Sequence, residues 1–127
     1  MSWKKEISQI KLREKLAKQQ GGPEAVKLQH NKGRLTLRER IDLLLDKESF
    51  EEIGKVAGGA EYDDEGNLTS LTPANFILGF GKIDGQDVIV GGEDFTVKGG
   101  SPNAAGLRKS IYTCLLYTSD AADDSQC

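Results

Sequence analysis

A glycine pair placed between an apolar segment and the start of a helix is the feature of this sequence best suited to hold an anion. Residues 99–102 read Gly-Gly-Ser-Pro and follow the apolar segment 95–97. Ser101 is predicted as the N-cap of the helix and Pro102 as its first residue. Free backbone N–H groups and the positive end of the helix dipole would then lie together, which suits a phosphate group or a developing oxyanion. The same spacing is also typical of an ordinary turn, so the pattern alone leaves both interpretations open.

Other motifs that could carry chemistry are incomplete. His30 is the single histidine, and its polar neighbours give it no orienting partner, so a solvated histidine is favoured over a catalytic base. An EF-hand loop counted from Asp63 would place Leu68 and Ala74 where it needs glycine and glutamate. The glycines of 79–85 span one residue too many for a dinucleotide fingerprint. We expect no catalytic residue and no metal site among these motifs.

Two helices are predicted in the first third of the chain. The first has a stripe of apolar residues at helical spacing and ends at a Gly-Gly-Pro sequence. Its stripe comprises Trp3, Ile7, Ile10 and Ala17. A polar, basic connector follows, and the second helix begins at a capping box formed by Thr36 and Glu39. Its apolar stripe comprises Leu37, Ile41, Leu44 and Leu45.

A β-hairpin is predicted around Asp84 and Gly85, a pair that adopts the positive φ angles of a tight turn. Apolar residues alternate with glycine before the turn, and the apolar run 88–90 follows it. Because this run is apolar on both faces, we expect a sheet covered by helices on both sides. A third strand is predicted at 95–97, followed by a helix that starts at Ser101. The sequence therefore predicts an α/β fold in which N-terminal helices precede a hairpin, a third strand and a helix.

Charge is distributed unevenly along the 127 residues. Residues 1–40 contain 11 Lys/Arg and 4 Asp/Glu, whereas residues 41–127 contain 6 and 16. An anion-binding role therefore belongs to the first third or to local backbone geometry. Trp3 is the single aromatic residue of the basic third, which favours a solvated helix face over a nucleic-acid surface. We find no export signal and no apolar run long enough to span a membrane, so we expect a cytoplasmic protein without a membrane partner.

Three stretches of the chain resemble the N-terminal part of the carboxyltransferase (beta) subunit of biotin-dependent acyl-CoA carboxylases, of the propionyl-CoA/methylcrotonyl-CoA carboxylase type. They are GRLTLRERIDLLLDKESFEE (33–52), GFGKIDGQDVIVGGEDFTVKGGS (79–101) and the PNAAGLRKSIY that follows. The resemblance implies that residues 33–112 are the start of an acyl-CoA carboxyltransferase N-terminal domain, preceded at 1–32 by a helix and a basic connector. The implied fold is crotonase-like (ClpP/crotonase) and incomplete in this chain.

The resemblance also implies an activity. Members of this family move a carboxyl group from carboxybiotin, held on a partner carrier domain, to the α-carbon of an acyl-CoA, and propionyl-CoA is favoured here. The family's main oxyanion turn should lie downstream of Tyr112, so no catalytic residue is expected in the chain and the fragment is expected to be inactive alone. A loop that matches the crotonase-fold loop along the CoA is implied to contact CoA. That loop comprises Lys98, Gly99, Gly100 and Ser101.

The resemblance has further implications for the surroundings of this loop. Phe95 and Val97, just before it, are expected in the core. The implied partners of the full-length protein are a biotin carboxylase/biotin carrier subunit and further copies of itself, with no nucleic acid.

The resemblance ends at Thr113. The remaining sequence, CLLYTSDAADDSQC, resembles translated sequencing-adapter DNA, so 113–127 are predicted to be a non-native tail. Cys114 and Cys127 would then be free thiols without function, and a natural acidic terminus is the alternative. Two other functions stay open. One is a small stand-alone acyl-CoA-binding or interaction protein, and the other is a fragment of a biotin-dependent acyl-CoA decarboxylase.

Overall fold

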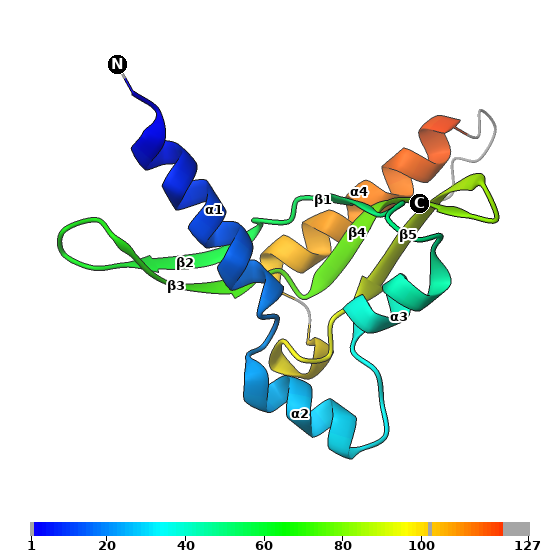
Figure 1. Cartoon of the computed structure of the whole chain (residues 1–127), viewed down its shortest axis with the longest axis horizontal. Helices are drawn as coiled ribbons and strands as arrows, with labels where there is room; N and C mark the ends of the chain where they lie inside the picture. The colour runs from blue at the N-terminus through cyan, green and yellow to red at the C-terminus, as the bar shows by residue number, and fades with distance from the viewer. Residues whose placement is uncertain (1, 102, 121–127) are drawn as a thin grey trace.

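The computed structural model describes residues 2–101 and 103–120. Its first helices are α1 (Lys4–Lys18), α2 (Pro23–Asn31) and α3 (Leu37–Leu44). The strands that follow are β1 (Glu51–Ile53), β2 (Gly58–Tyr62), β3 (Leu68–Pro73), β4 (Phe76–Ile83) and β5 (Gln86–Glu93). A short 3₁₀ turn, η1 (Lys98–Gly100), leads to α4 (Ala104–Asp120), as Figure 1 shows. Among the described residues, none of the helices combines the length and apolar character that a membrane span requires.

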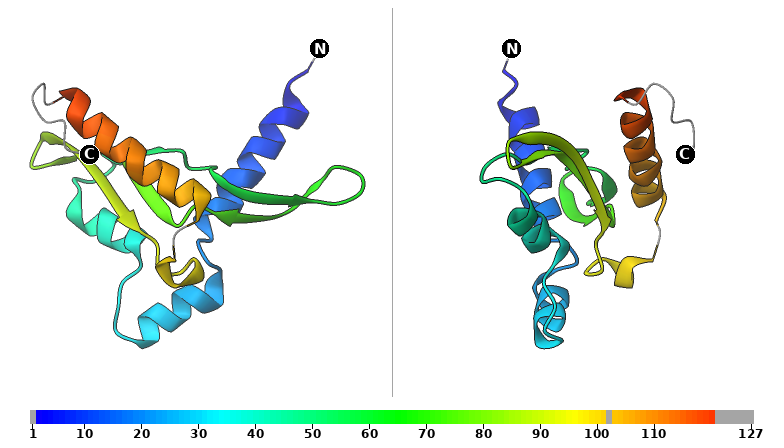
Figure 2. Two further views of the ribbon diagram at one scale, coloured as in Figure 1. Left: turned by 180° about the vertical axis from the view of Figure 1, so that it is seen from behind. Right: turned by 90° about the vertical axis from the view of Figure 1, so that its right-hand side faces the viewer.

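The predicted hairpin is confirmed and forms two strands of a three-stranded antiparallel sheet with the order β1-β4-β5. Asp84 (φ 50°) and Gly85 (φ 80°) make the tight turn between β4 and β5. Helices α3 and α4 lie on opposite faces of this sheet, as expected (Figure 2). The neighbouring residues Gly91 and Gly92 of β5 illustrate this, because the first faces α4 at Thr113 and the second faces α3 at Leu37.

The third strand of the sheet is β1, and the prediction of a strand at 95–97 is wrong. Those residues form a turn, because the buried Asp94 carboxylate accepts hydrogen bonds from the Thr96 N–H at 2.9 Å and the Thr96 hydroxyl at 2.6 Å. The Val97 N–H donates to the Asp94 carbonyl at 3.2 Å. Local bonds thus satisfy groups that a strand would direct to a neighbour. Val97 is buried as expected, whereas Phe95 is 57% exposed, contrary to the prediction that it lies in the core.

The main hydrophobic core lies between α3 and the sheet. Ile41, Leu45 and Ile77 form its buried centre. The partly buried residues around them are Leu37, Phe50, Ile83, Val88 and Val90. Leu44, predicted in the same stripe, is 53% exposed. The helix ends there, and the extended backbone of Leu45 (φ −90°, ψ 155°) turns that side chain into the core instead.

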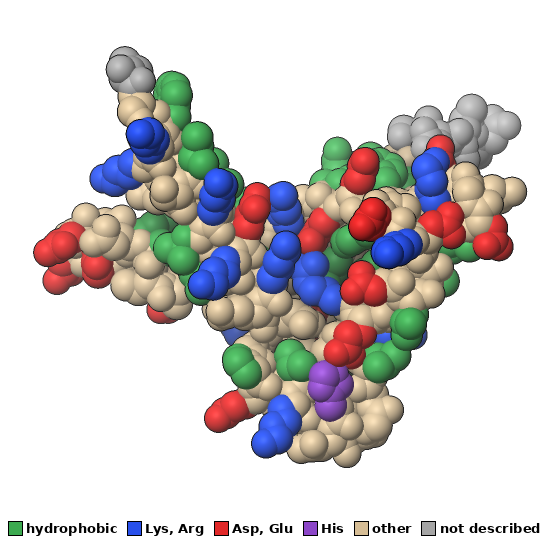
Figure 3. Space-filling model, viewed as in Figure 1, with side chains coloured by type: hydrophobic (Ala, Val, Ile, Leu, Met, Phe, Trp, Pro, Cys, Tyr) green, Lys and Arg blue, Asp and Glu red, His purple; other side chains and the backbone are tan. Residues whose placement is uncertain are grey.

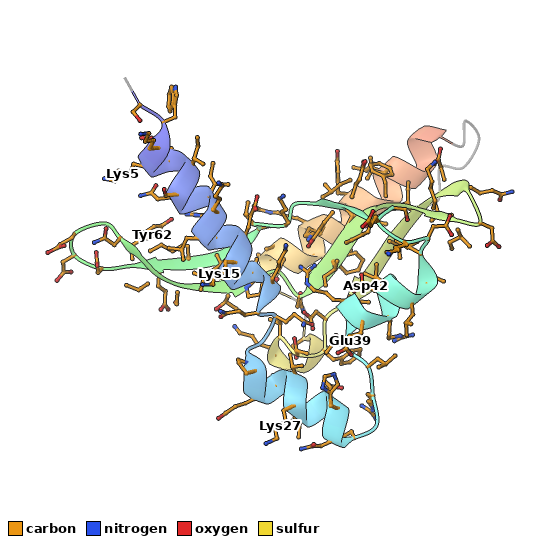
Figure 4. The ribbon with its side chains drawn as sticks, in the orientation of Figure 1. Lys5, Lys15, Lys27, Glu39, Asp42 and Tyr62 are labelled. Carbon is orange, nitrogen blue, oxygen red and sulfur yellow. The ribbon has the colours of Figure 1, made fainter. Side chains whose placement is uncertain are left out.

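Helix α1 and the β2–β3 hairpin project from the sheet as two arms (Figure 1). They meet where Arg13 contacts the Tyr62 hydroxyl, and Tyr62 lies on the side of the hairpin nearest α1 (Figure 4). Glu14 of α1 also pairs at 3.0 Å with Lys55, which lies between β1 and β2. Ala17 is the one buried member of the predicted apolar stripe, and Trp3 is 66% exposed. Figure 3 shows lysines and arginines along α1 and acidic side chains at the hairpin tip, which reproduces the charge division of the sequence.

The predicted capping box at the start of α3 is confirmed and makes a testable contribution to stability. The Glu39 N–H donates to the buried Thr36 hydroxyl at 3.3 Å, and the Thr36 N–H donates to the Glu39 carboxylate at 2.8 Å. We expect Thr36→Ala to lower the free energy of unfolding by about 1 kcal/mol, because an N–H of the first helical turn loses its acceptor. Chemical denaturation measures this change. Thr36→Ser keeps the hydroxyl and should retain most of the stability; an equal loss in both variants would attribute the effect to the methyl group.

Candidate functional site

The predicted loop at 98–101 is a tight left-handed turn between buried Val97 and α4. Lys98 (φ 48°), Gly99 (φ 62°) and Gly100 (φ 81°) are successive residues with positive φ. The Gly100 N–H donates to the Val97 carbonyl at 3.0 Å, and a Cβ on Gly100 would lie 2.9 Å from the Phe95 ring. No atom lies within 4 Å of a Cβ built on Gly99. This turn therefore needs its glycines and has open space beside the first of them.

Two asparagines hold the turn against the start of α4. The Asn75 side-chain amide donates to the Ser101 carbonyl, and the Asn75 carbonyl accepts the Asp94 N–H at 2.7 Å. The Asn103 side chain accepts the Gly106 N–H at 2.7 Å. Asn103 is thus the N-cap of α4, and the prediction of Ser101 in that role is wrong, because the helix begins only at Ala104. Pro102, predicted as the first helical residue, lies outside the described residues.

A cavity of about 530 Å³ lies beside this loop, between the base of the β2–β3 hairpin and the first turns of α4. Figure 2 shows α4 beginning next to the two strands. Lys98, Asn103 and Arg108 contribute polar walls, Glu61 contributes an acidic one, and small residues of β2 and α4 line the rest. Of the four predicted site residues, Lys98 lines the cavity. Gly99, Gly100 and Ser101 form the turn next to it.

His30 has an orienting partner that sequence reasoning missed. The expected polar connector contains α2, and His30 Nε2 lies 2.7 Å from the Glu39 carboxylate at the start of α3. Figure 4 shows Glu39 where α3 approaches α2. The hydrogen bond from the Thr36 N–H, followed by the interaction with His30, holds the pKa of Glu39 below its ordinary value. The histidine therefore links two helices in this structure.

A partly buried group of charges that no sequence pattern predicted links α3, β1 and α4. The Arg38 guanidinium donates two hydrogen bonds of 2.9 Å to the Glu52 carboxylate. Lys109, 9% exposed, donates to the Gly54 carbonyl at 3.4 Å. Burial lowers the pKa of Lys109, while the charge of Glu52 acts in the opposite direction. Arg38 and Glu52 come together only through the packing of α3 near the β1 edge, which no local motif indicates.

The end of the described chain differs from the sequence expectations. Helix α4 continues beyond Thr113 to Asp120, where no helix was predicted; this stretch contains neither proline nor glycine to stop it. Cys114 is disulfide-bonded, so the prediction of a free thiol is wrong for that residue. Cys127 lies outside the described residues. Within the part of the chain that the structure describes, no group of three or more His, Cys, Asp or Glu residues could hold a metal ion.

The hairpin, the glycine turn and the covering helix define a mixed α/β fragment with a cavity at the helix start. The chain belongs to the carboxyl transferase domain family, whose sequence profile matches residues 28–125. It is 38% identical over 105 residues to the propionyl-CoA carboxylase beta chain of Roseobacter denitrificans, covering 81% of this chain and 20% of that protein. It is also 38% identical over 92 residues to the methylmalonyl-CoA decarboxylase subunit alpha of Veillonella parvula, covering 71% and 18%.

A solved structure agrees with the predicted fold class. The hexameric transcarboxylase 12S, with methylmalonyl-coenzyme A and methylmalonic acid bound, matches with a TM-score of 0.77 and 27% identity, over 94% of this chain and 24% of the 12S chain. This match supports a fragment of crotonase-like fold. The chain spans about a fifth of the length of the curated relatives that it matches.

Proposed function

We propose that the chain is part of a biotin-dependent carboxyltransferase that acts on an acyl-CoA, with propionyl-CoA as the favoured substrate. The observation that carries this proposal is the similarity to a propionyl-CoA carboxylase beta chain over 81% of the chain. Carboxybiotin on a partner carrier domain would supply the carboxyl group, which the α-carbon of the acyl-CoA accepts. No described residue has a feature suited to the biotin ring in particular, so none is assigned a role toward it.

We propose Lys98, Gly99, Gly100 and Ser101 as residues that contact CoA. The left-handed turn supports this assignment, because two consecutive glycines let a ligand approach the backbone closely. The open space at Gly99 and the cavity lined by Lys98 support it further. The contribution of this chain is therefore binding and positioning, and no catalytic residue is assigned within it.

The proposed organisation has three parts. Residues 1–32 are the N-terminal helix and connector, 33–112 are the start of the carboxyltransferase N-terminal domain, and 113–127 are a non-native tail. The capping box at Thr36 marks the start of the first helix in the second part. The family match extends beyond 112 to residue 125, so a domain segment that continues past Tyr112 is the alternative to the proposed tail. Proposed partners are a biotin carboxylase/biotin carrier subunit and a homo-oligomer of the full-length protein, in the cytoplasm; the 12S relative is a hexamer.

A chimera tests this function. The chain replaces the matching fifth of the Roseobacter beta chain, joined either after Tyr112 or after Cys127, and the complex is assayed for carboxylation of propionyl-CoA and acetyl-CoA. We expect transfer from the first chimera and none from the second, because a non-native tail would interrupt the fold. The unmodified beta chain is the control. A correctly assembled Tyr112 chimera that carboxylates no short acyl-CoA would contradict the proposed function, and an active Cys127 chimera would contradict the proposed tail.

The similarity to the Veillonella decarboxylase subunit favours decarboxylation of an acyl-CoA as a second candidate. An equivalent chimera with that subunit, assayed with methylmalonyl-CoA, separates the two functions. Whichever chimera keeps the larger fraction of its parent's rate identifies the better match, since the substituted fifth is the same in both.

A further inference from the structure

Helix α1 carries a row of exposed apolar side chains on the part that projects from the body of the molecule. Trp3 is 66%, Ile7 49% and Ile10 53% exposed. The Ile7 N–H donates to the Trp3 carbonyl at 2.9 Å, so Trp3 is continuous with the first helical turn. Residues at i, i+4 and i+7 lie on one face of a helix, which places the three side chains in a single apolar row.

A second row, made only of lysines, runs beside the apolar row. Each step along the helix turns it by about 100°, and Lys4 follows Trp3 just as Lys11 follows Ile10. The members of this lysine row, which all lie on one face, are Lys4, Lys11, Lys15 and Lys18. All four are exposed, and within the described residues none of them takes part in an ion pair. Figure 3 shows basic side chains along the visible side of α1 and apolar ones at its edge.

The remaining face of α1 is occupied by the protein itself. Arg13 contacts the β2–β3 hairpin, Leu16 lines a small cavity against β3, and Ala17 is buried. Glu14 pairs with Lys55 at 3.0 Å. The acidic tip of the hairpin extends from the side of α1 opposite the apolar side chains (Figure 3). These contacts hold the helix with both rows turned toward solvent.

The chemistry of the two rows suits an anionic lipid surface. Residues 4–18 contain six Lys/Arg and two Glu, and one of these, Glu14, is already paired. A helix with Trp and aliphatic residues on one side and lysines beside them lies in the plane of a bilayer interface. Trp favours the headgroup level, while lysine buries its aliphatic stem and extends its charge to the phosphates. A row of mobile point charges also matches a diffuse negative surface better than it matches one fixed carboxylate.

A helix of a second copy is a less suitable occupant of the apolar row. The next residue at the same spacing after Trp3, Ile7 and Ile10 is Glu14, so the row covers only about two turns. A coiled coil needs apolar positions sustained over three or more heptads. Lysines beside so short a row would also repel their symmetry-related copies in a parallel pair.

We propose that α1 binds the surface of an anionic bilayer, with the apolar row in the headgroup region and the lysine row on the lipid phosphates. This binding lies beyond the proposed function and does not depend on it. The expectation of no membrane partner rests on the lack of an apolar run that could span a bilayer, and a helix that lies on the surface needs no such run. The contact is reversible and weakens as salt concentration rises, because much of the attraction is electrostatic.

Vesicle binding of the 127-residue chain tests this proposal. One set of vesicles contains equal parts of phosphatidylcholine and phosphatidylglycerol, and the other contains phosphatidylcholine alone. Trp3 is the single tryptophan of the chain, so its fluorescence reports directly on the apolar row. We expect the anionic vesicles to sediment with the chain and to shift the emission of Trp3 to shorter wavelength. The neutral vesicles should do neither.

The lysine row is tested by Lys11→Gln combined with Lys15→Gln. We expect this variant to bind anionic vesicles at least about tenfold more weakly than the parent chain, because two charges near the surface are lost. The matched control is Lys27→Gln combined with Lys47→Gln, which removes the same charge from exposed positions outside α1 (Figure 4 labels Lys27 on α2). The control should bind as the parent does.

The apolar row is tested by Ile7→Ser combined with Ile10→Ser, which should also weaken binding by about tenfold. The matched control is Leu28→Ser combined with Leu43→Ser, two exposed leucines of α2 and α3, and it should retain parental binding. Circular dichroism compares the helix content of every variant with that of the parent chain.

Several results would overturn the proposal. Neutral vesicles that bind as tightly as anionic ones, or control variants that lose as much affinity as the test variants, would show that these two rows are not the lipid contact. Sedimentation with an unshifted Trp3 emission would place the contact elsewhere on the chain. Dimers that form without lipid and are lost in the Ile7 and Ile10 variant, with no vesicle binding, would assign the row to a second copy. None of these results bears on carboxyl transfer, so the proposed function stands or falls separately.

Discussion

Replacing Gly21 with alanine is expected to lower the free energy of unfolding by about 3 kcal/mol or more. A Cβ on Gly21 would lie 1.6 Å from the Thr96 carbonyl oxygen and 2.4 Å from its carbon. Backbone atoms cannot rotate away as a side chain can. The Gly21 N–H also donates to the Thr96 hydroxyl at 2.9 Å, and that hydroxyl donates to the buried Asp94. Separating the two backbones would therefore break this chain of hydrogen bonds as well.

Gly59→Ala is the matched control for this prediction. No atom lies within 4 Å of a Cβ built there, and the residue has no positive φ. We expect a change within about 0.5 kcal/mol, as is usual for unhindered surface positions. Urea denaturation of both variants, followed by circular dichroism, measures the difference. Equal stability of the two variants would show that the segment connecting α1 and α2 moves away from Thr96 with little loss of stability.

Features that depend on neighbouring residues were predicted correctly from the sequence. The capping box of Thr36 and Glu39 and the turn at Asp84-Gly85 each need only a few consecutive residues, and both are present. The two-sided cover of the sheet also follows from a local pattern, the apolar run 88–90. In each case the chemistry of a short segment determines its structure, whatever lies elsewhere in the chain.

Strand β1, the turn at 95–97 and helix α2 were missed, each for its own reason. Strand β1 has three residues and exists through its pairing with β4, where Glu51 lies opposite Phe80. The segment 95–97 has the composition of a strand, yet the side chain of Asp94 bonds its backbone into a turn. Helix α2 is polar, and none of its residues is buried, so no apolar stripe indicated it. Sheet pairing decided the first of these features, and local side-chain competition with a strand decided the second.

The candidate site likewise combines a feature that a local sequence pattern predicts with contacts that no local pattern predicts. Its glycine turn was located by sequence, because left-handed residues favour glycine. The residues that hold the turn were not, since Asn75 precedes the Ser101 carbonyl that it binds by 26 positions. Arg108 likewise has no local signal, because it lines the cavity only where α4 meets the β2–β3 hairpin.

Gly106→Ala is the second substitution from which we expect a large effect, although alanine normally stabilises a helix interior by about 1 kcal/mol relative to glycine. A Cβ on Gly106 would lie 1.9 Å from the side-chain oxygen of Asn75. Asn75 is buried, and its amide nitrogen donates to the Ser101 carbonyl. It cannot turn aside without losing that bond, which holds the candidate site in place. We therefore expect a net loss of about 2 kcal/mol in the free energy of unfolding, with shifted amide signals at 98–101.

A double-mutant cycle with Asn75→Ala identifies the cause of this loss. The single variant Asn75→Ala removes the donor to Ser101 and should be destabilising by itself, by about 1–3 kcal/mol. In that background the obstructing oxygen is gone, so adding Gly106→Ala should cost nothing or restore part of the stability through the helix preference for alanine. The two substitutions would then be strongly non-additive. If Gly106→Ala costs the same in both backgrounds, the side chain of Asn75 is not the obstacle to a Cβ at position 106.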